Sequence, residues 1–219
     1  MARISGPPLL APAIGYAALT LVGLVLGISG LRPTSSAADV AAYLSTHATE
    51  ATLLAAAVVA AAIPLAVFTA VAHQRMRGLG AAVPGPTIAL AGGLISAATL
   101  TVSGLAAWTA VAAAPLGDAP LVRALTTLSF AAGGPGFVAP FGLLLAGLAV
   151  PALVLGLLPR ALAWTGLGLA VIAMLALFSL LTPALYALLP VVRFGGLAWL
   201  LAAAALLPRE RARRPVRTP

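Results

Sequence analysis

Uncharged apolar segments of about 20 residues recur along the chain, separated by short stretches rich in proline, glycine and charge. Since roughly 20 apolar helical residues cross the hydrocarbon core of a bilayer, each such segment predicts one membrane-spanning helix. Six segments fit this description: 10–30, 51–72, 87–111, 137–158, 161–181 and 191–207. The pattern therefore predicts an all-α fold, a polytopic membrane helical bundle that forms one domain over residues 1–208.

Residues 119–133 predict a shorter helix of a different kind. Asp118 is a favourable N-cap, Pro120 suits a first turn, and the Gly-Gly-Pro run at 133–135 is typical of a helix end. Because about 14 residues are too few to span a bilayer, we expect a short amphipathic helix at the outer surface, hinged to the fourth span. The glycines do not predict a phosphate loop, since the Lys–Ser/Thr ending is missing and Pro135 removes a backbone donor.

The composition agrees with a membrane protein and excludes several other classes. Hydrophobic residues make up 62% of the 219 and charged residues 7%, with a mean hydropathy of +1.14. A soluble domain carries far more charge on its surface. The absence of cysteine excludes disulfides and thiol chemistry. The net charge of +8 does not indicate a nucleic-acid partner, because the arginines are spread over short loops and a tail.

The distribution of charge predicts how the chain is oriented. With the N-terminus inside, the inner segments hold nine arginines and one acid, whereas the outer segments hold three arginines and three acids. The inner arginines are Arg3, Arg75, Arg77, Arg160, Arg209, Arg211, Arg213, Arg214 and Arg217. Cytoplasmic loops are rich in Arg and Lys, so we expect both termini in the cytoplasm. All 12 basic residues are arginine, which with the abundant Ala, Gly and Leu is typical of high-GC bacteria, and we expect the bacterial plasma membrane.

The tail at 209–219 has five arginines and no apolar periodicity. It predicts a cytoplasmic segment held near anionic lipid of the inner leaflet. The lipid bilayer itself is the other expected partner, and a second membrane protein or a second copy of the chain is a further alternative.

Arg193 is the most unusual charge, because it lies in the first turns of the sixth span. A cation near hydrocarbon needs a partner or a route to water. One interpretation is that its side chain extends to the outer interface. The alternative is an ion pair within an outer cluster formed by Arg193 with Asp118, Asp39 or Glu50.

A weakly polar stripe runs along the third span, where Ser96, Thr99 and Ser103 follow Gly92 at helical spacing. Such a stripe lines a transport path in some proteins. Membrane helices also place small residues and hydroxyls against each other, and we expect this packing role here. Gly23 and Gly27 predict a close helix contact for the same reason.

His47 and Glu50 stand three residues apart, with Asp39 upstream, and three such groups can bind a metal or relay protons. We expect instead a solvated outer loop, in which Ser45 or Thr46 caps the second span. No residue is expected to be catalytic, to bind a cofactor or to ligate a metal.

Residues 157–209 carry a Leu-Pro-Arg turn that opens a span containing Trp and Gly, and a last span rich in aromatic residues that ends in arginine. In this segment the chain resembles a group of uncharacterised, often actinobacterial, six-span membrane proteins. The resemblance implies a domain of unknown function and supplies no catalytic residues.

Three classes of function fit these patterns. The first is a non-enzymatic accessory, assembly or envelope protein, which we expect because no ionisable residue lies at the centre of a span. The second is a small-molecule or lipid carrier that uses the stripe on the third span. The third is an intramembrane enzyme with a site at the outer surface.

The predicted topology can be tested by single-cysteine labelling, since the chain has no cysteine of its own. We expect Arg77→Cys and Arg213→Cys to react with a membrane-impermeant maleimide only after the cells are opened, and Asp118→Cys to react in intact cells. Labelling of positions 77 and 213 from opposite sides would contradict six crossings.

Overall fold

The computed structural model describes residues 8–27 and 35–208, and nearly all of these residues are helical. Its helices are α1 Leu10–Gly27, α2 Ala37–Thr46, α3 Ala48–Gly78, α4 Gly85–Ala113, α5 Ala119–Gly133, α6 Pro135–Val154, α7 Arg160–Ala176 and α8 Leu188–Leu206, with short 3₁₀ turns η1 Ala114–Leu116, η2 Leu177–Leu180 and η3 Pro183–Ala187. Six helical segments are long and apolar enough to cross a membrane. The predicted all-α polytopic bundle is confirmed. The arginine tail at 209–219 lies outside the described residues.

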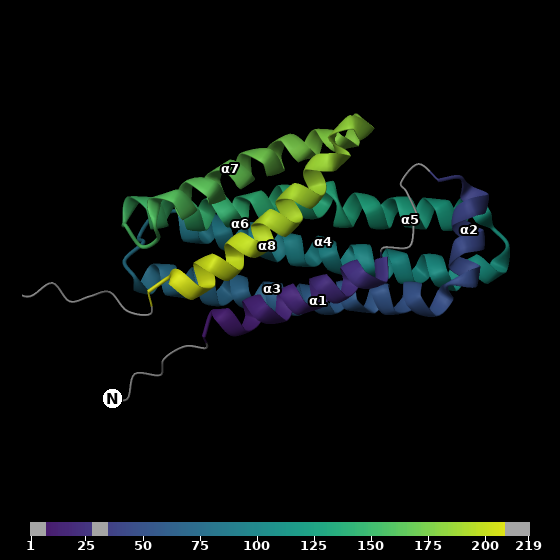
Figure 1. Cartoon of the computed structure of the whole chain (residues 1–219), viewed down its shortest axis with the longest axis horizontal. Helices are drawn as coiled ribbons and strands as arrows, with labels where there is room; N and C mark the ends of the chain where they lie inside the picture. The colour runs from purple at the N-terminus through teal and green to yellow at the C-terminus, as the bar shows by residue number, and fades with distance from the viewer. Residues whose placement is uncertain (1–7, 28–34, 209–219) are drawn as a thin grey trace, which may run out of the picture.

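The six spanning segments differ markedly in length (Figure 1). Helices α3 and α4 have 31 and 29 residues, whereas α1, α7 and α8 have 18, 17 and 19. At 1.5 Å per residue the long helices measure roughly 45 Å, against about 30 Å for the hydrocarbon core. Long and short helices each have one terminus toward the end of the bundle that holds the first and last described residues, here called the proximal end (Figure 1). The long helices therefore project at the other end, the distal end.

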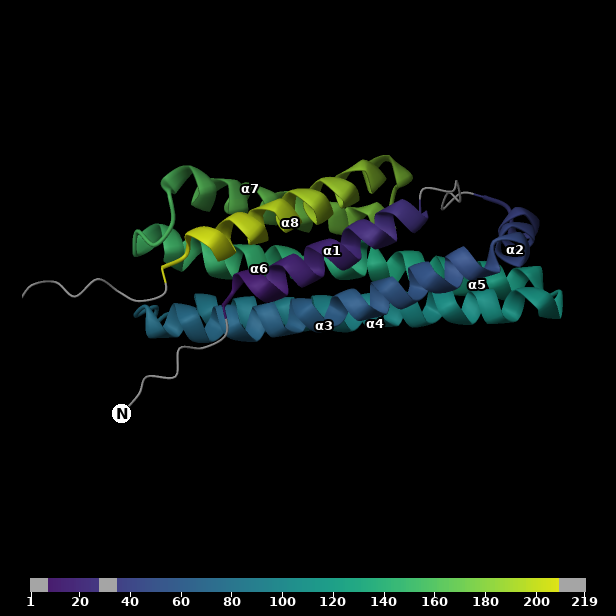
Figure 2. The same ribbon diagram turned by 60° about the horizontal axis from the view of Figure 1, so that its bottom comes forward.

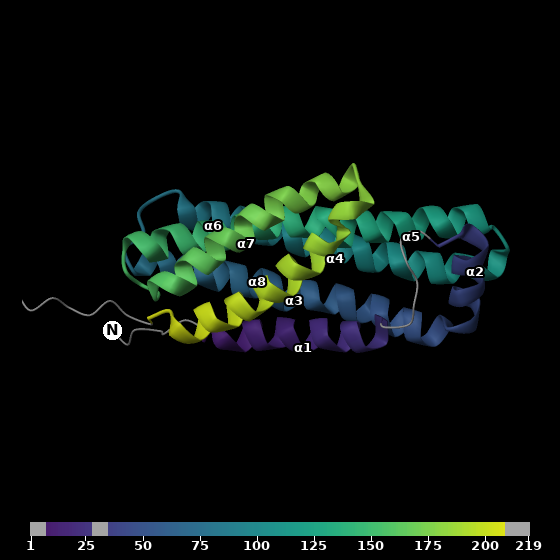
Figure 3. The same cartoon turned by 45° about the horizontal axis from the view of Figure 1, so that its top comes forward.

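Helix α5 has the bounds that the sequence predicts, and the Asp118 carboxylate caps it by accepting from Leu121 N at 3.0 Å. Its direction is less expected, because α5 continues in line with α6 instead of lying across the bundle (Figures 1 and 3). The break at Gly134 ends one helix and starts the next without a change of course. Segment Ala119–Val154 is thus one long apolar rod, packed lengthwise on α4.

Helix α2 occupies a stretch that the sequence predicts as a loop. Ser36 caps it by accepting from Asp39 N, and the helix lies across the distal end of α3, α4 and α5 (Figures 1 and 2). Val40 and Leu44 of α2 pack with Val122 of α5 in a small core separate from that of the bundle. The expected cap of the second span is wrong: Ser45 and Thr46 donate to carbonyls of α2, and α3 begins after His47.

Two exposed tryptophans mark the levels of the membrane surfaces. Trp164 lies near the start of α7 at the proximal end, and Trp108 lies six residues before Ala114, near the distal end of α4. Tryptophan is enriched at both interfaces of a bilayer. We define the distal cap as α2, η1 and the parts of α3, α4 and α5 beyond the level of Trp108. We expect this cap to stand outside the hydrocarbon core.

Small residues bring the central helices into close contact. At Gly147 of α6, an added Cβ atom would lie 2.5 Å from Ala89 N and 2.6 Å from Gly85 O, both backbone atoms of α4. Around this contact lies the main core, in which Phe137, Phe141 and Leu144 are fully buried. Close backbone approach is the principal way in which membrane helices gain packing energy.

Gly147→Ala therefore tests the α4–α6 contact. The methyl group cannot enter without moving backbone, so we expect a loss of roughly 1–3 kcal/mol in unfolding free energy. The measurement is reversible unfolding in mixed micelles with increasing SDS. Gly168→Ala on α7 is the control, since nothing lies within 4 Å of its Cβ position, and it is expected to leave stability unchanged or raise it. Equal stability of the two variants would contradict the tight contact.

Candidate ligand-binding groove

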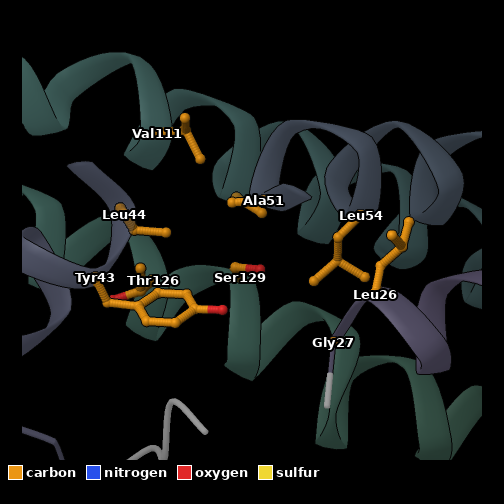
Figure 4. A pocket seen from close by; sticks show the side chains of 10 residues that line it. Leu26, Gly27, Tyr43, Leu44, Ala51, Leu54, Val111, Thr126 and Ser129 are labelled. Carbon is orange, nitrogen blue, oxygen red and sulfur yellow. The ribbon is translucent and has the colours of Figure 1, made fainter. Parts of the chain in front are cut away.

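Two neighbouring cavities lie beside the distal half of α1. The first has a volume of about 210 Å³ and is enclosed by α1, α2, α3, α4 and α5. Figure 4 shows Leu54, Tyr43 and Ser129 directed toward a common space, with Gly27 at its edge. Its wall is mainly apolar, with the hydroxyl groups of Tyr43, Thr126 and Ser129 on one side.

The second cavity has a volume of about 240 Å³ and lies deeper along α1. It is bounded by α1, α3, α4 and α8, and most of its lining is apolar. Its polar lining residues are Tyr16, Thr20 and Arg193. Gly27 and Leu54 line both cavities, so the two adjoin and we treat them together as the α1 groove.

A helix break positions Arg193 at this groove. Pro135 has no backbone N–H, and Phe137 N donates to Gly134 O at 3.2 Å, one residue closer than the α-helical pattern requires. The carbonyl of Gly133 is therefore left without a backbone donor among the described residues. The Nη2 atom of Arg193 donates to this oxygen at 2.7 Å.

One aromatic ring lies against the same guanidinium, and a second aromatic residue lies nearby. Its central carbon lies 5.0 Å from the centre of the Phe137 ring, a distance typical of a cation–π contact. The buried Tyr16 side chain on α1 is close enough to interact electrostatically with it. Arg193 is thus held by α5 and α6 and lies near Tyr16 of α1, although it belongs to α8.

The acids of the expected outer cluster have other roles. Asp118 caps α5, Asp39 accepts from Ser36 Oγ at 2.7 Å, and Glu50 lies in the first turn of α3. Between residues 35 and 208 no ion pair joins any of them to Arg193. The structure places the guanidinium against a carbonyl and a ring instead, because the break at Gly134 supplies an unpaired acceptor within reach.

The polar stripe of α4 serves contacts between helices. Ser96 Oγ donates to Gly92 O at 2.8 Å and lies 3.3 Å from Phe137 O on α6, while Ser103 Oγ donates to Ser129 O on α5 at 2.8 Å. Thr99 donates to carbonyls of its own helix. None of the three lines either cavity described above.

Gly23 and Gly27 do not form the close helix contact that the sequence predicts. An added Cβ atom at either would meet only the tip of Leu54, at 3.6 Å, so α1 stands off from α3 at this level. The glycines border the groove instead of closing a tight helix contact. Helical spacing does place Tyr16, Thr20 and the two glycines on one face, which is the signal that could have revealed them.

The residues considered for a metal or proton site do not gather. The His47 ring stacks on Tyr43 with centroids 4.4 Å apart, and neither His47 nor Glu50 lines the groove. In the described ranges no group of three His, Asp or Glu side chains is arranged to hold a metal ion.

No protein-family model, curated protein or solved structure matches this chain.

Ser103→Ala tests the link between α4 and α5 that supports the break. Loss of the hydrogen bond to Ser129 O should lower the unfolding free energy by about 0.5–1 kcal/mol, the usual value between membrane helices. Unfolding in SDS-containing micelles measures it. Ser45→Ala is a matched control, since its exposed hydroxyl bonds only within α2, and no change is expected there. A Ser103 variant as stable as the control would show that this bond does not support the packing.

Proposed function

We propose that the chain is a multi-pass protein of the bacterial plasma membrane with its proximal end in the cytoplasm. Arg75, Arg77 and Arg160 lie on elements that end or begin at the proximal end, whereas Asp39, Glu50 and Asp118 belong to the distal cap (Figure 1). Such an asymmetry of arginine is typical of cytoplasmic and external faces. The same arrangement would leave the distal cap outside the cell.

We further propose that the protein binds or carries a hydrophobic small molecule or a lipid in the α1 groove. The adjoining cavities support this proposal most directly. Each is smaller than the 300–1,000 Å³ of a usual small-molecule pocket, but together they fall within that range. Mostly apolar walls with a few polar groups at fixed positions are the common design of such pockets.

The exposure of α1 supports access from the membrane. Only 22% of its spanning window is buried, against 61% for the α5–α6 segment, so α1 is the least enclosed span. Leu21, Val22 and Val25 are about half exposed or more and face away from the bundle. A molecule dissolved in the lipid would enter the groove alongside α1, and it would not have to cross the packed core of the bundle.

A role in assembly with another membrane protein is the second candidate. The supporting observation is Leu116, a 74% exposed apolar residue in the distal cap, beyond the level of Trp108. Exposed apolar side chains outside the hydrocarbon core favour contact with a partner. An enzyme is not proposed, since the side chains considered for one do not line the groove.

Gly23→Leu tests ligand binding. An added Cβ atom at Gly23 would make only an ordinary van der Waals contact with Leu54, so the variant should fold normally. The larger side chain would fill the second cavity. We expect it to weaken binding of dodecan-1-ol at least tenfold, as measured by native mass spectrometry of protein in detergent.

Gly168→Leu is the matched control, because this glycine faces open space on α7 outside the groove. It should bind the alcohol as the parent does. No binding by any of the three proteins would overturn the proposal and favour the assembly role.

A further inference from the structure

We propose that the α1 groove selects a single-chain amphiphile with an anionic head, and that Arg193 holds the head through a carboxylate or phosphate oxygen. This inference rests on the proposed binding function and specifies its ligand. The head would lie in the second cavity, where Arg193 meets the apolar wall.

The guanidinium of Arg193 is held in place, but not all of its N–H donors have an acceptor among the described residues. It has five N–H donors, and its hydrogen bond to the described residues goes to Gly133 O. The ring of Phe137 holds one side of the group without accepting its N–H donors in the way an oxygen does. Donors therefore remain for an oxygen that enters the cavity.

The charge of Arg193 has no compensation from an acid in the described part of the chain. A full positive charge within a membrane span is costly unless an anion or water reaches it. The carbonyl of Gly133 supplies a dipole but not a negative charge. An anionic head would supply the missing charge, and it would gain a charge-assisted hydrogen bond in a site of low polarity.

Two hydroxyl groups on α1 complete the polar end of the cavity. Thr20 is one helical turn from Tyr16, and the two side chains lie near each other. Both line the second cavity, and Tyr16 also lies near Arg193. A planar cation with flanking hydroxyl donors is suited to carboxylate or phosphate oxygens.

The depth of Arg193 suits a molecule that enters from the distal leaflet. Its carbonyl partner Gly133 packs against Ser103, which precedes Trp108 by five residues on α4. At 1.5 Å per residue, the polar end lies about 7–8 Å below the level of Trp108. The head group would therefore lie slightly below the interface, with its chain directed toward the distal cap.

The shape of the groove limits the apolar part. From Arg193 the wall continues over Val58 and Leu54 into the first cavity, where Leu26 and Val111 line the space (Figure 4). Each cavity is small, and they adjoin in sequence along α1 rather than side by side. One unbranched chain fits this course better than a two-chain phospholipid.

Three probes with the same chain test the inference: dodecanoate, dodecyl phosphate and dodecan-1-ol. Their dissociation constants would be measured by native mass spectrometry for the full-length protein in an uncharged detergent. We expect at least one anionic probe to bind tenfold or more tightly than the alcohol. The stronger of the two anions identifies a carboxylate or a phosphate as the preferred head.

Arg193→Gln should abolish this preference, so that the anionic probes and the alcohol bind this variant with affinities within about twofold of one another. Glutamine can still donate to Gly133 O, so the helix break keeps a partner. Arg193→Lys should retain part of the preference because it keeps the charge. Arg160→Gln at the proximal end is the control for net charge and should behave as the parent does.

The outcomes separate the two proposals. Equal affinity of the parent for all three probes would overturn the anionic head and leave the binding function intact. An anion preference that survives in Arg193→Gln would overturn the role of Arg193. Binding of none of the probes would overturn both.

Discussion

The mismatch between the thickness of a bilayer and the lengths of these helices determines the architecture. Helices α3 and α4 are about 45 Å long, while the hydrocarbon core is about 30 Å thick. Aligned at the proximal end, they must project at the distal end together with α5. The projecting part needs cover for its apolar faces, and α2 supplies it by packing across the end. The distal cap is thus a consequence of helix length.

The same mismatch produces the α1 groove. The described part of α1 runs to Gly27, at the level of Leu54, and α3 continues outward from Leu54 toward its start at Ala48. Because Gly23 and Gly27 have no side chains and α2 lies farther out, the space between α1 and α3 stays partly unfilled. The side chain of Arg193 extends from α8 into this space. It donates to the carbonyl of Gly133, which the break at Gly134 and Pro135 leaves without a backbone donor among the described residues. A cavity and a cation therefore meet beside the distal part of α1.

Much of the fold follows from the sequence, because the length of an apolar segment and its bordering charges depend on local residues alone. The spans and the ends of α5 belong to this class, as does the cap by Asp118. Helix α2 could not be recognised in this way, since its ten residues are of mixed polarity and gain stability from contact with α4 and α5. The direction of α5 could not be predicted from the sequence either. The Gly-Gly-Pro run predicts a break in hydrogen bonding but not the angle between the helices on its two sides.

Only part of the candidate site could be predicted from the sequence. Arg193 stands out in any apolar span, yet its partner is a backbone carbonyl, and backbone groups leave no mark in a sequence. Tyr16 and Thr20 resemble residues that face an interface, and Gly23 with Gly27 resembles a tight helix contact. These residues border a cavity only because α1 stands off from α3, and tertiary packing sets that distance.

Nitroxide depth measurement along α4 and η1 tests the central claim most directly. Val102 and Leu116 are both well exposed, at 47% and 74%, and lie on either side of the level of Trp108. In lipid nanodiscs, a spin label at position 102 should collide mainly with oxygen, which concentrates in lipid. A label at position 116 should collide mainly with a water-soluble nickel chelate. Preference for oxygen at both positions would place the distal cap inside the membrane and contradict the account.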